Sequence, residues 1–113
     1  AGSEMARAGR TLGLPTAEEV FADRAYDDTG NLVPRSQPGA MIHDPELAAT
    51  NVLRMLEDGV IVSITGKRIP CTAPSVCVHG DEPSAVAMAT TLRRTLEAKG
   101  VRITTLPEMR ERF

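Results

Sequence analysis

The segment Val76-Cys77-Val78-His79-Gly80-Asp81-Glu82-Pro83 decides the fold class of this chain. Its first three residues are apolar and β-prone, which predicts a buried strand over residues 75–78. Polarity begins abruptly at His79, and Pro83 opens a stretch with the start signals of a helix. A buried strand that runs directly into a helix is typical of parallel α/β architecture, in which ligands bind at the carboxyl ends of strands.

Downstream of this junction, residues 83–99 predict a long helix that ends at Gly100. The apolar face of this helix is expected to carry four residues, namely Val86, Ala89, Leu92 and Leu96. Residues 101–106 then predict a last extended strand.

Upstream of the junction, Asp44 and Pro45 form the N-cap and first turn of a second helix, which ends at Gly59. The apolar runs 60–64 and 68–70 flank a turn that contains glycine, so these residues predict a β-hairpin.

The first part of the chain predicts a short helix and a short strand. Ser3 is a suitable N-cap, and Gly13 ends the helix. The apolar residues expected on one face of this helix are Met5, Ala8 and Leu12. Residues 17–22 predict a strand, whereas residues 26–40 have no period and predict a loop that Asp, Gly and Pro shape.

Strands that alternate with helices predict the α/β fold class, with parallel strands and helices outside the sheet. Two or three parallel strands cannot cover both faces of a sheet, so we expect one part of a larger α/β sheet or barrel. The chain begins at Ala1 without an initiator methionine, which also predicts a fragment. Residues 1–113 are expected to lie in a single domain.

The composition excludes several classes of protein. Hydrophobic residues are 42% and charged residues 25% of the 113 residues, as in soluble globular proteins. The net charge is −2 without a basic stripe, so we expect no nucleic-acid partner. No apolar run reaches about 18 residues, so we expect no membrane span, and the start of the sequence has no charged-then-apolar pattern, so we expect no leader. Cys71 and Cys77 fit no zinc motif and are expected to be reduced and structural in a cytoplasmic protein.

His79 and Asp81 are the first candidates for catalysis. Both follow a buried strand, where a histidine can exchange a proton near neutral pH and an aspartate can hold its tautomer or act as the base. Gly80 is expected to permit a tight turn between them. The alternative is structural, with Asp81 serving only as a helix cap and His79 as a satisfied strand-end residue.

Glu19, Asp23 and Arg24 are the second group of candidates. Asp23 and Arg24 directly follow a predicted strand, so they are expected on the same rim as His79. The alternative for these residues is a simple ion pair or an exposed turn.

Arg35, Ser36 and Gln37 are the third group, because a proline-fixed loop can present an arginine fork and neutral donors to a carboxylate or phosphate. The alternative is a solvated loop. His43 is expected to pack at a helix end, and Asp28 and Glu82 are expected to be solvated. The chain carries no motif typical of phosphate binding, metal binding or serine hydrolases.

Four segments together resemble the C-terminal part of the LamB/YcsF family, the 5-oxoprolinase subunits of the A type. In chain order they are Glu19-Val20-Phe21-Ala22-Asp23-Arg24-Ala25-Tyr26, Leu32-Val33-Pro34-Arg35-Ser36-Gln37-Pro38-Gly39-Ala40, Ile42-His43-Asp44-Pro45 and Val76-Cys77-Val78-His79-Gly80-Asp81. Family members are roughly twice as long, and the N-terminal half of the family pattern is absent here.

The resemblance implies an irregular seven-stranded (β/α) barrel of the glycoside hydrolase/deacetylase type. It implies ATP-driven opening of the lactam of 5-oxo-L-proline to L-glutamate, together with partner subunits B and C. His79, Asp81 and Asp23 would then be catalytic, while substrate binding would fall to Glu19, Arg24, Arg35, Ser36 and Gln37. We expect no resident metal, and self-association is left open. The alternatives are a metal-assisted carbohydrate deacetylase or other amidohydrolase, and a non-catalytic module that docks its protein partners through residues 26–40.

Overall fold

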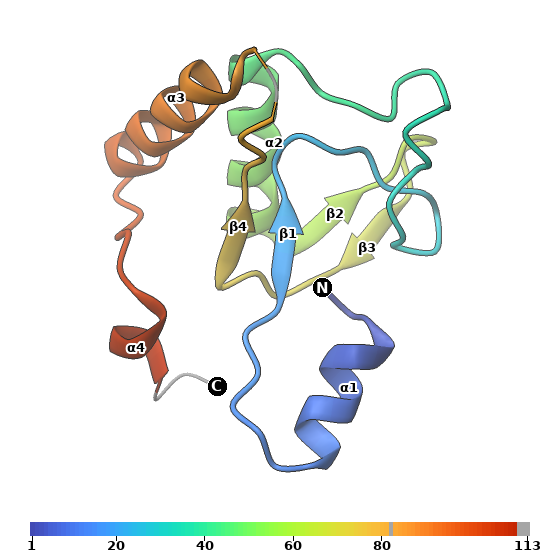
Figure 1. Ribbon diagram of the computed structural model, residues 1–113, viewed down its shortest axis with the longest axis vertical. Coiled ribbons are helices and arrows are strands. Elements are labelled where there is room, and N and C mark those ends of the chain that lie inside the picture. Colours follow the sequence, from blue (N-terminus) through green and yellow to red (C-terminus); the bar gives the residue numbers. More distant parts are fainter. Residues whose placement is uncertain (82, 111–113) are drawn as a thin grey trace.

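The two predicted strands that precede Asp23 and His79 are present and pair in parallel. The computed structural model describes residues 1–81 and 83–110. Strands β1 (Glu19–Phe21) and β4 (Ser75–Cys77) run side by side in the same direction, with Val20 opposite Val76 (Figure 1). The β4 segment therefore confirms the strand that precedes His79, although its three residues are half-buried and not buried.

The hairpin is also confirmed. Strands β2 (Val60–Val62) and β3 (Arg68–Pro70) pair antiparallel, with Ile61 opposite Ile69. Within the described residues the two sheets are two-stranded, one parallel and one antiparallel. The chain thus has a mixed α/β fold.

Helix α2 (Pro45–Asp58) has the predicted ends. The Asp44 carboxylate accepts a hydrogen bond from the Glu46 N–H at 3.0 Å, which satisfies one of the free donors of the first turn. Gly59 ends the helix in the left-handed region, with φ of 66°.

Helix α3 (Ala85–Ala98) begins two residues later than predicted, and its buried face contains half of the predicted residues. Its N-cap is Ser84, not Asp81. The buried residues of α3 are Met88, Thr91, Leu92 and Leu96, whereas Val86 is 80% exposed and Ala89 is exposed. The prediction is confirmed for Leu92 and Leu96 and wrong for Val86 and Ala89. The small residues of α2 pack against the side of α3 that carries Met88, Leu92 and Leu96.

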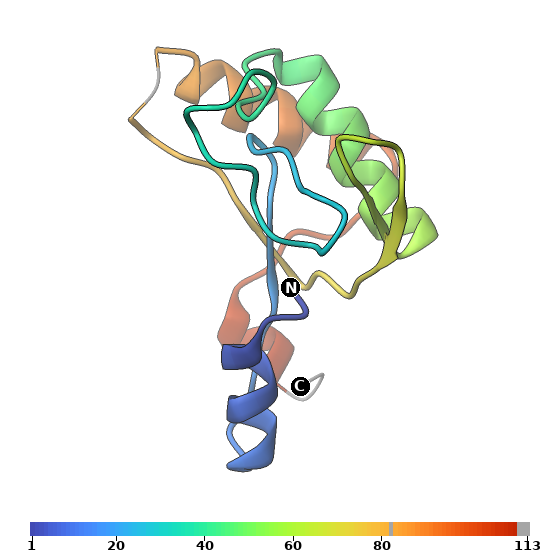
Figure 2. The same cartoon turned by 90° about the vertical axis from the view of Figure 1, so that its right-hand side faces the viewer.

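The apolar face predicted for the first helix is exposed. Helix α1 (Glu4–Thr11) does begin after the N-cap Ser3, but Met5 is 84% and Leu12 is 75% exposed. The buried residue of α1 is Ala6. Figures 1 and 2 explain this result, because α1 lies at one end of the molecule, away from α2 and α3.

The strand predicted for residues 101–106 is absent from the described chain. Residues 101–105 have no regular structure, and α4 (Leu106–Met109) follows. The Glu108 carboxylate accepts hydrogen bonds from the Thr105 N–H at 3.0 Å and the Thr105 hydroxyl at 2.9 Å. A hydrogen bond from the Thr104 hydroxyl, followed by these two from Thr105, lowers the pKa of Glu108 to about 2. An apolar run becomes a strand only where another strand pairs with it, and here a capped helix turn begins instead.

Two apolar clusters support this arrangement. The first lies between α2 and α3 and contains Ala22, Ala48, Ala49, Val52, Met88, Leu92 and Leu96. The second joins the parallel strands to the hairpin and contains Val20, Tyr26, Met55 and Ile61. No helix in the described ranges is both long and apolar enough to cross a membrane.

Candidate active site

His79 and Asp23 form a hydrogen-bonded pair at the carboxyl ends of β4 and β1. The His79 Nδ1 atom lies 2.9 Å from both carboxylate oxygens of Asp23, and the His79 backbone N–H donates to Asp23 Oδ2 at 3.2 Å. Asp23 is buried, with 4% exposure, while the His79 side chain is 24% exposed. The pair therefore combines a water-excluded carboxylate with an imidazole that solvent can reach.

The backbone brings these two residues together across 56 positions of sequence. The Ala22 N–H donates to the Cys77 carbonyl at 3.0 Å, which extends the parallel pairing of β1 and β4 by one residue. In both strands, the apolar residues are followed by polar residues at the same edge of the sheet. The expectation that Asp23 shares a rim with His79 is confirmed, since parallel strands end on the same side.

The contact with Asp23 allows the tautomer of a neutral His79 ring to be assigned by its hydrogen bond. An ionised carboxylate only accepts hydrogen bonds, so Nδ1 carries the proton that faces Asp23. Among the residues that the structure describes, none offers a hydrogen-bond partner to Nε2. This ring nitrogen is therefore available to accept a proton from water or a substrate.

Phe21 adds a contact that sequence reasoning missed. Its ring stacks on the His79 ring, with centroids 5.5 Å apart and planes inclined by 13°. Phe21 is opposite Cys77 in the sheet, two residues before His79. Position in the strand could have suggested this contact, because residues two apart in a strand share a face.

Asp81 does not hold His79, which corrects one predicted role. Asp81 Oδ2 lies 3.9 Å from Arg35 Nη1, and both side chains are more than half exposed. Gly80 does not need the conformational freedom of glycine, because its φ is not positive and an added Cβ would meet no described atom within 4 Å. The residue that positions the imidazole is Asp23.

Glu19 lies at the opposite end of β1, so it is not on the rim with His79. Its carboxylate accepts a hydrogen bond from the Ser75 hydroxyl at 2.8 Å. Ser36 and Gln37 are exposed in the loop, where the Gln37 N–H donates to the Pro34 carbonyl at 2.9 Å. The structure does not join these three side chains to the His79–Asp23 pair by any hydrogen bond.

Arg24 diverges from Asp23, its neighbour in sequence. Its Nη2 donates to the Val33 carbonyl at 2.9 Å, and the residue is 9% exposed. Arg24 therefore stabilises the loop that follows β1, and it does not face His79.

Asp28 is not simply solvated, as the sequence had suggested. It accepts a hydrogen bond from the Ser63 hydroxyl at 2.6 Å and another from the Thr65 hydroxyl. These bonds lower the pKa of Asp28 below its usual range and tie the loop to the β-hairpin. Glu82 lies outside the described residues, and His43 is exposed directly before the N-cap of α2.

Cys71 and Cys77 are free thiols, as predicted. Burial is the main cause that raises the pKa of both cysteines, so both are protonated near neutral pH. No three or more His, Cys, Asp or Glu side chains in the described part of the chain are grouped so that they could hold a metal ion.

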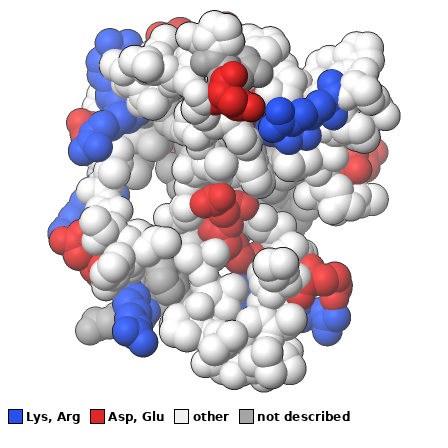
Figure 3. Space-filling model, viewed as in Figure 1, with Lys and Arg blue, Asp and Glu red and all other residues white. Residues whose placement is uncertain are grey.

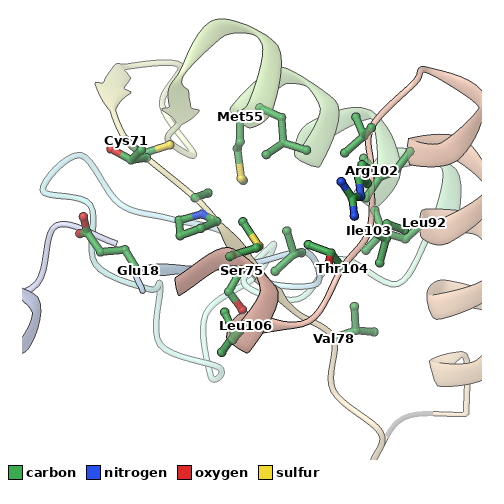
Figure 4. Close-up of a pocket in the computed structure, with 18 of the residues that line it drawn as sticks. Glu18, Met55, Cys71, Ser75, Val78, Leu92, Arg102, Ile103, Thr104 and Leu106 are labelled. Atoms are coloured by element: carbon green, nitrogen blue, oxygen red, sulfur yellow. The ribbon is translucent and has the colours of Figure 1, made fainter. Parts of the chain in front are cut away.

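A second feature is a wide groove of about 1180 Å³ beside β4. Figure 4 shows Met55, Leu92, Val78 and Leu106 among the side chains around it. None of the predicted site residues lines this groove, which is mainly apolar. The groove leaves one side of β4 uncovered.

Charged side chains of both signs are interspersed on the face that Figure 3 shows, and the described basic residues form no continuous patch there. The surface charge on this face thus gives no general attraction for a polyanion. The local chemistry of the His79–Asp23 pair is more informative.

The fold is mixed α/β, and a buried aspartate and a histidine lie at the ends of two adjacent parallel strands. These features define a class of α/β proteins whose site is suited to proton transfer. Within that class, the chain belongs to the LamB/YcsF family, whose profile matches residues 1–111.

The relatives are consistent with this assignment. The chain is 53% identical over 103 residues to a 5-oxoprolinase subunit of the A type from Rhodopseudomonas palustris, covering 91% of this chain and 41% of that protein. It is 48% identical over 106 residues to the corresponding 5-oxoprolinase subunit from Coprothermobacter proteolyticus, covering 94% and 41%. The crystal structure of a lactam utilization protein from Thermus thermophilus matches with a TM-score of 0.81 and 37% identity, covering 90% of this chain and 40% of that one. The chain thus spans about 40% of the length of the relatives it matches.

Proposed function

We propose that this chain supplies the proton-transfer residues of an ATP-dependent 5-oxoprolinase, which opens the lactam of 5-oxo-L-proline to L-glutamate. The observation that carries the proposal is the 2.9 Å contact between His79 Nδ1 and the buried Asp23 carboxylate. The names of the relatives support a role in 5-oxoproline metabolism. Amide hydrolysis needs a group that takes a proton from water and returns one to the leaving nitrogen, and this pair is suited to that task.

In the proposed reaction, His79 Nε2 accepts a proton as the water oxygen bonds to the lactam carbonyl carbon. The ring C–N bond then breaks, and the same proton passes to the nitrogen, which becomes the amino group of glutamate. Asp23 keeps Nδ1 protonated and stabilises the imidazolium that forms. Direct attack on the lactam, and attack on a lactam first phosphorylated by ATP, both need this proton transfer.

Arg35 is the candidate for holding the substrate carboxylate. It lies close to Asp81 at the edge of the loop, and its guanidinium is 53% exposed, so a carboxylate can reach it. Asp81 positions Arg35 in this proposal, and Ser36 and Gln37 offer neutral hydrogen-bonding groups from the same loop. Glu19 is less suitable for substrate binding, because it bonds to Ser75 at the far end of the strand.

The rest of the proposed assembly lies outside this chain. We propose that partner subunits B and C complete the enzyme in the cytoplasm and that ATP is bound by residues other than these, since the chain has no phosphate-binding motif. The chain would form the C-terminal part of an irregular seven-stranded (β/α) barrel. The uncovered groove beside β4 supports this arrangement, because parallel strands are normally covered on both faces.

The test is ATP-coupled glutamate formation by the full-length protein with its partner subunits. His79→Ala and Asp23→Asn are each expected to lower turnover by about 10²–10⁴-fold. Asp58→Asn removes a carboxylate from the exposed end of α2 and serves as the charge-matched control. Near-normal turnover by the His79→Ala enzyme would contradict the proposal.

Asp23 acts through His79, so its variant needs a second measurement. ¹⁵N NMR of the His79 ring reports which nitrogen is protonated. Asp23→Asn is expected to shift the ring toward a mixture of tautomers, because the amide no longer requires a proton on Nδ1. Loss of turnover with an unchanged tautomer would mean that Asp23 has another role.

A further inference from the structure

A small pocket on the other side of the loop contains two arginines and no acidic residue. The pocket has a volume of about 250 Å³ and lies between α2, the hairpin and the loop after β1. Its polar lining consists of Arg24, Asn51, Arg54, Tyr26 and Ser63. The pocket is distinct from the His79–Asp23 site, because neither His79 nor Asp23 lines it.

The buried arginine in this pocket lacks sufficient acceptors. Arg24 is 9% exposed, and the acceptor that the described residues give it is the neutral Val33 carbonyl. Its Nε is fully buried and has no hydrogen-bond partner among the residues that the structure describes. A guanidinium carries a fork of N–H donors, and burying such a cation without a counter-charge is costly. A bound anion would supply that counter-charge.

Arg54 provides a second cation from α2. It is half-buried, and no ion pair joins it to any described acidic residue. The Asp28 carboxylate, which accepts hydrogen bonds from the lining residue Ser63 and from the Thr65 hydroxyl, does not itself line the pocket. The positive charge that faces the pocket is therefore not neutralised by its own lining.

We infer that this pocket binds a small oxyanion, a carboxylate or a phosphate, between Arg24 and Arg54. The fork geometry of arginine matches both groups, and Asn51 supplies a neutral amide donor. The volume is below the roughly 300–1,000 Å³ typical of drug-sized ligands, which favours a small anion over a nucleotide. This site goes beyond the proposed lactam chemistry and does not depend on it.

The test is an NMR titration of the protein with inorganic phosphate and, separately, with acetate at constant ionic strength. Binding is expected to give saturable shifts in the backbone amides of Arg24, Asn51, Arg54 and Ser63. The comparison of the two anions shows which oxyanion the pocket prefers.

Arg54→Met is the primary variant, because Arg24→Met would also remove the bond to the Val33 carbonyl. It is expected to weaken binding by at least about tenfold, the loss of one charge-assisted contact. Arg94→Met on the exposed face of α3 makes the same change in net charge and should alter the affinity by less than about twofold. Absence of saturable shifts with both anions, or equal affinity of the Arg54→Met and Arg94→Met proteins, would overturn the inference.

Discussion

The ring of Phe21 stacks on the ring of His79, with 5.5 Å between centroids, while Asp23 binds the Nδ1 edge of the same imidazole. β1 and the residues directly after it thus fix the orientation of the His79 ring. Phe21 sets the plane of the ring, and Asp23 sets which edge of the ring faces the protein. The orientation of Nε2 is a consequence of strand pairing, because Phe21 is held opposite Cys77.

Phe21→Leu is expected to loosen the His79 ring without unfolding the protein, since leucine keeps most of the apolar contact. A stacked aromatic pair contributes about 0.5–1.5 kcal/mol beyond the area it buries. The ring-current shift of the His79 Hδ2 and Hε1 signals should disappear in the NMR spectrum. His43 is the other histidine of the chain, so its signals distinguish a local change from general unfolding. Unchanged His79 signals would show that the rings do not stack in solution.

Leu92→Ala is expected to lower the free energy of unfolding by about 2–5 kcal/mol, because Leu92 is 5% exposed between α3 and α2. Val86→Ala on the same helix removes an 80% exposed side chain and should change it by less than about 0.5 kcal/mol. Urea denaturation followed by circular dichroism measures both values. Similar losses in the two variants would mean that the buried face of α3 is assigned incorrectly.

Gly59→Ala is expected to destabilise the protein by about 1–2 kcal/mol, because Gly59 has φ of 66° and a Cβ disfavours that conformation. The space itself is adequate, since the nearest atom to an added Cβ is the Cys71 carbonyl oxygen at 3.7 Å. Gly80→Ala is the matched variant and should be neutral or slightly stabilising, because Gly80 has no positive φ. Thermal unfolding compares the two, and a larger loss for Gly80→Ala would contradict the description of the turn.

Asp28 is expected to contribute to acid sensitivity. Hydrogen bonds from the Ser63 and Thr65 hydroxyls lower its pKa in the folded state below the usual value of about 3.9. Its contribution to stability is thus fully present above that value and is lost as the pH falls through the lowered pKa. Asp28→Asn should make the stability of the protein less dependent on pH below about 4.

The pH effect has a second, independent variant. Replacing the donors in Ser63→Ala/Thr65→Val should reduce the same part of the pH dependence while leaving Asp28 in place. Urea midpoints measured between about pH 2.5 and 6 would reveal it. Parallel curves for the wild-type and Asp28→Asn proteins would show that these hydrogen bonds do not persist in solution.

Local sequence signals determined most of the elements. Asp44, Pro45 and Gly59 define the ends of α2 by backbone chemistry that needs no distant partner. The apolar run before His79 likewise specified a strand, which is half-buried in the structure, and parallel strand ends implied that Asp23 and His79 share an edge. These features depend on neighbours a few residues away, or on a general rule of α/β folds.

Only the tertiary structure decided which residues meet. Asp23, and not Asp81, is the hydrogen-bond partner of His79. Arg24 points into a different pocket, and Glu19 lies at the other end of its strand. The tertiary structure also exposed Val86 and Met5, and it gave residues 101–105 no strand to pair with. The physical reason is that side-chain direction and strand formation depend on packing and pairing partners far away in the sequence, which local propensity does not encode.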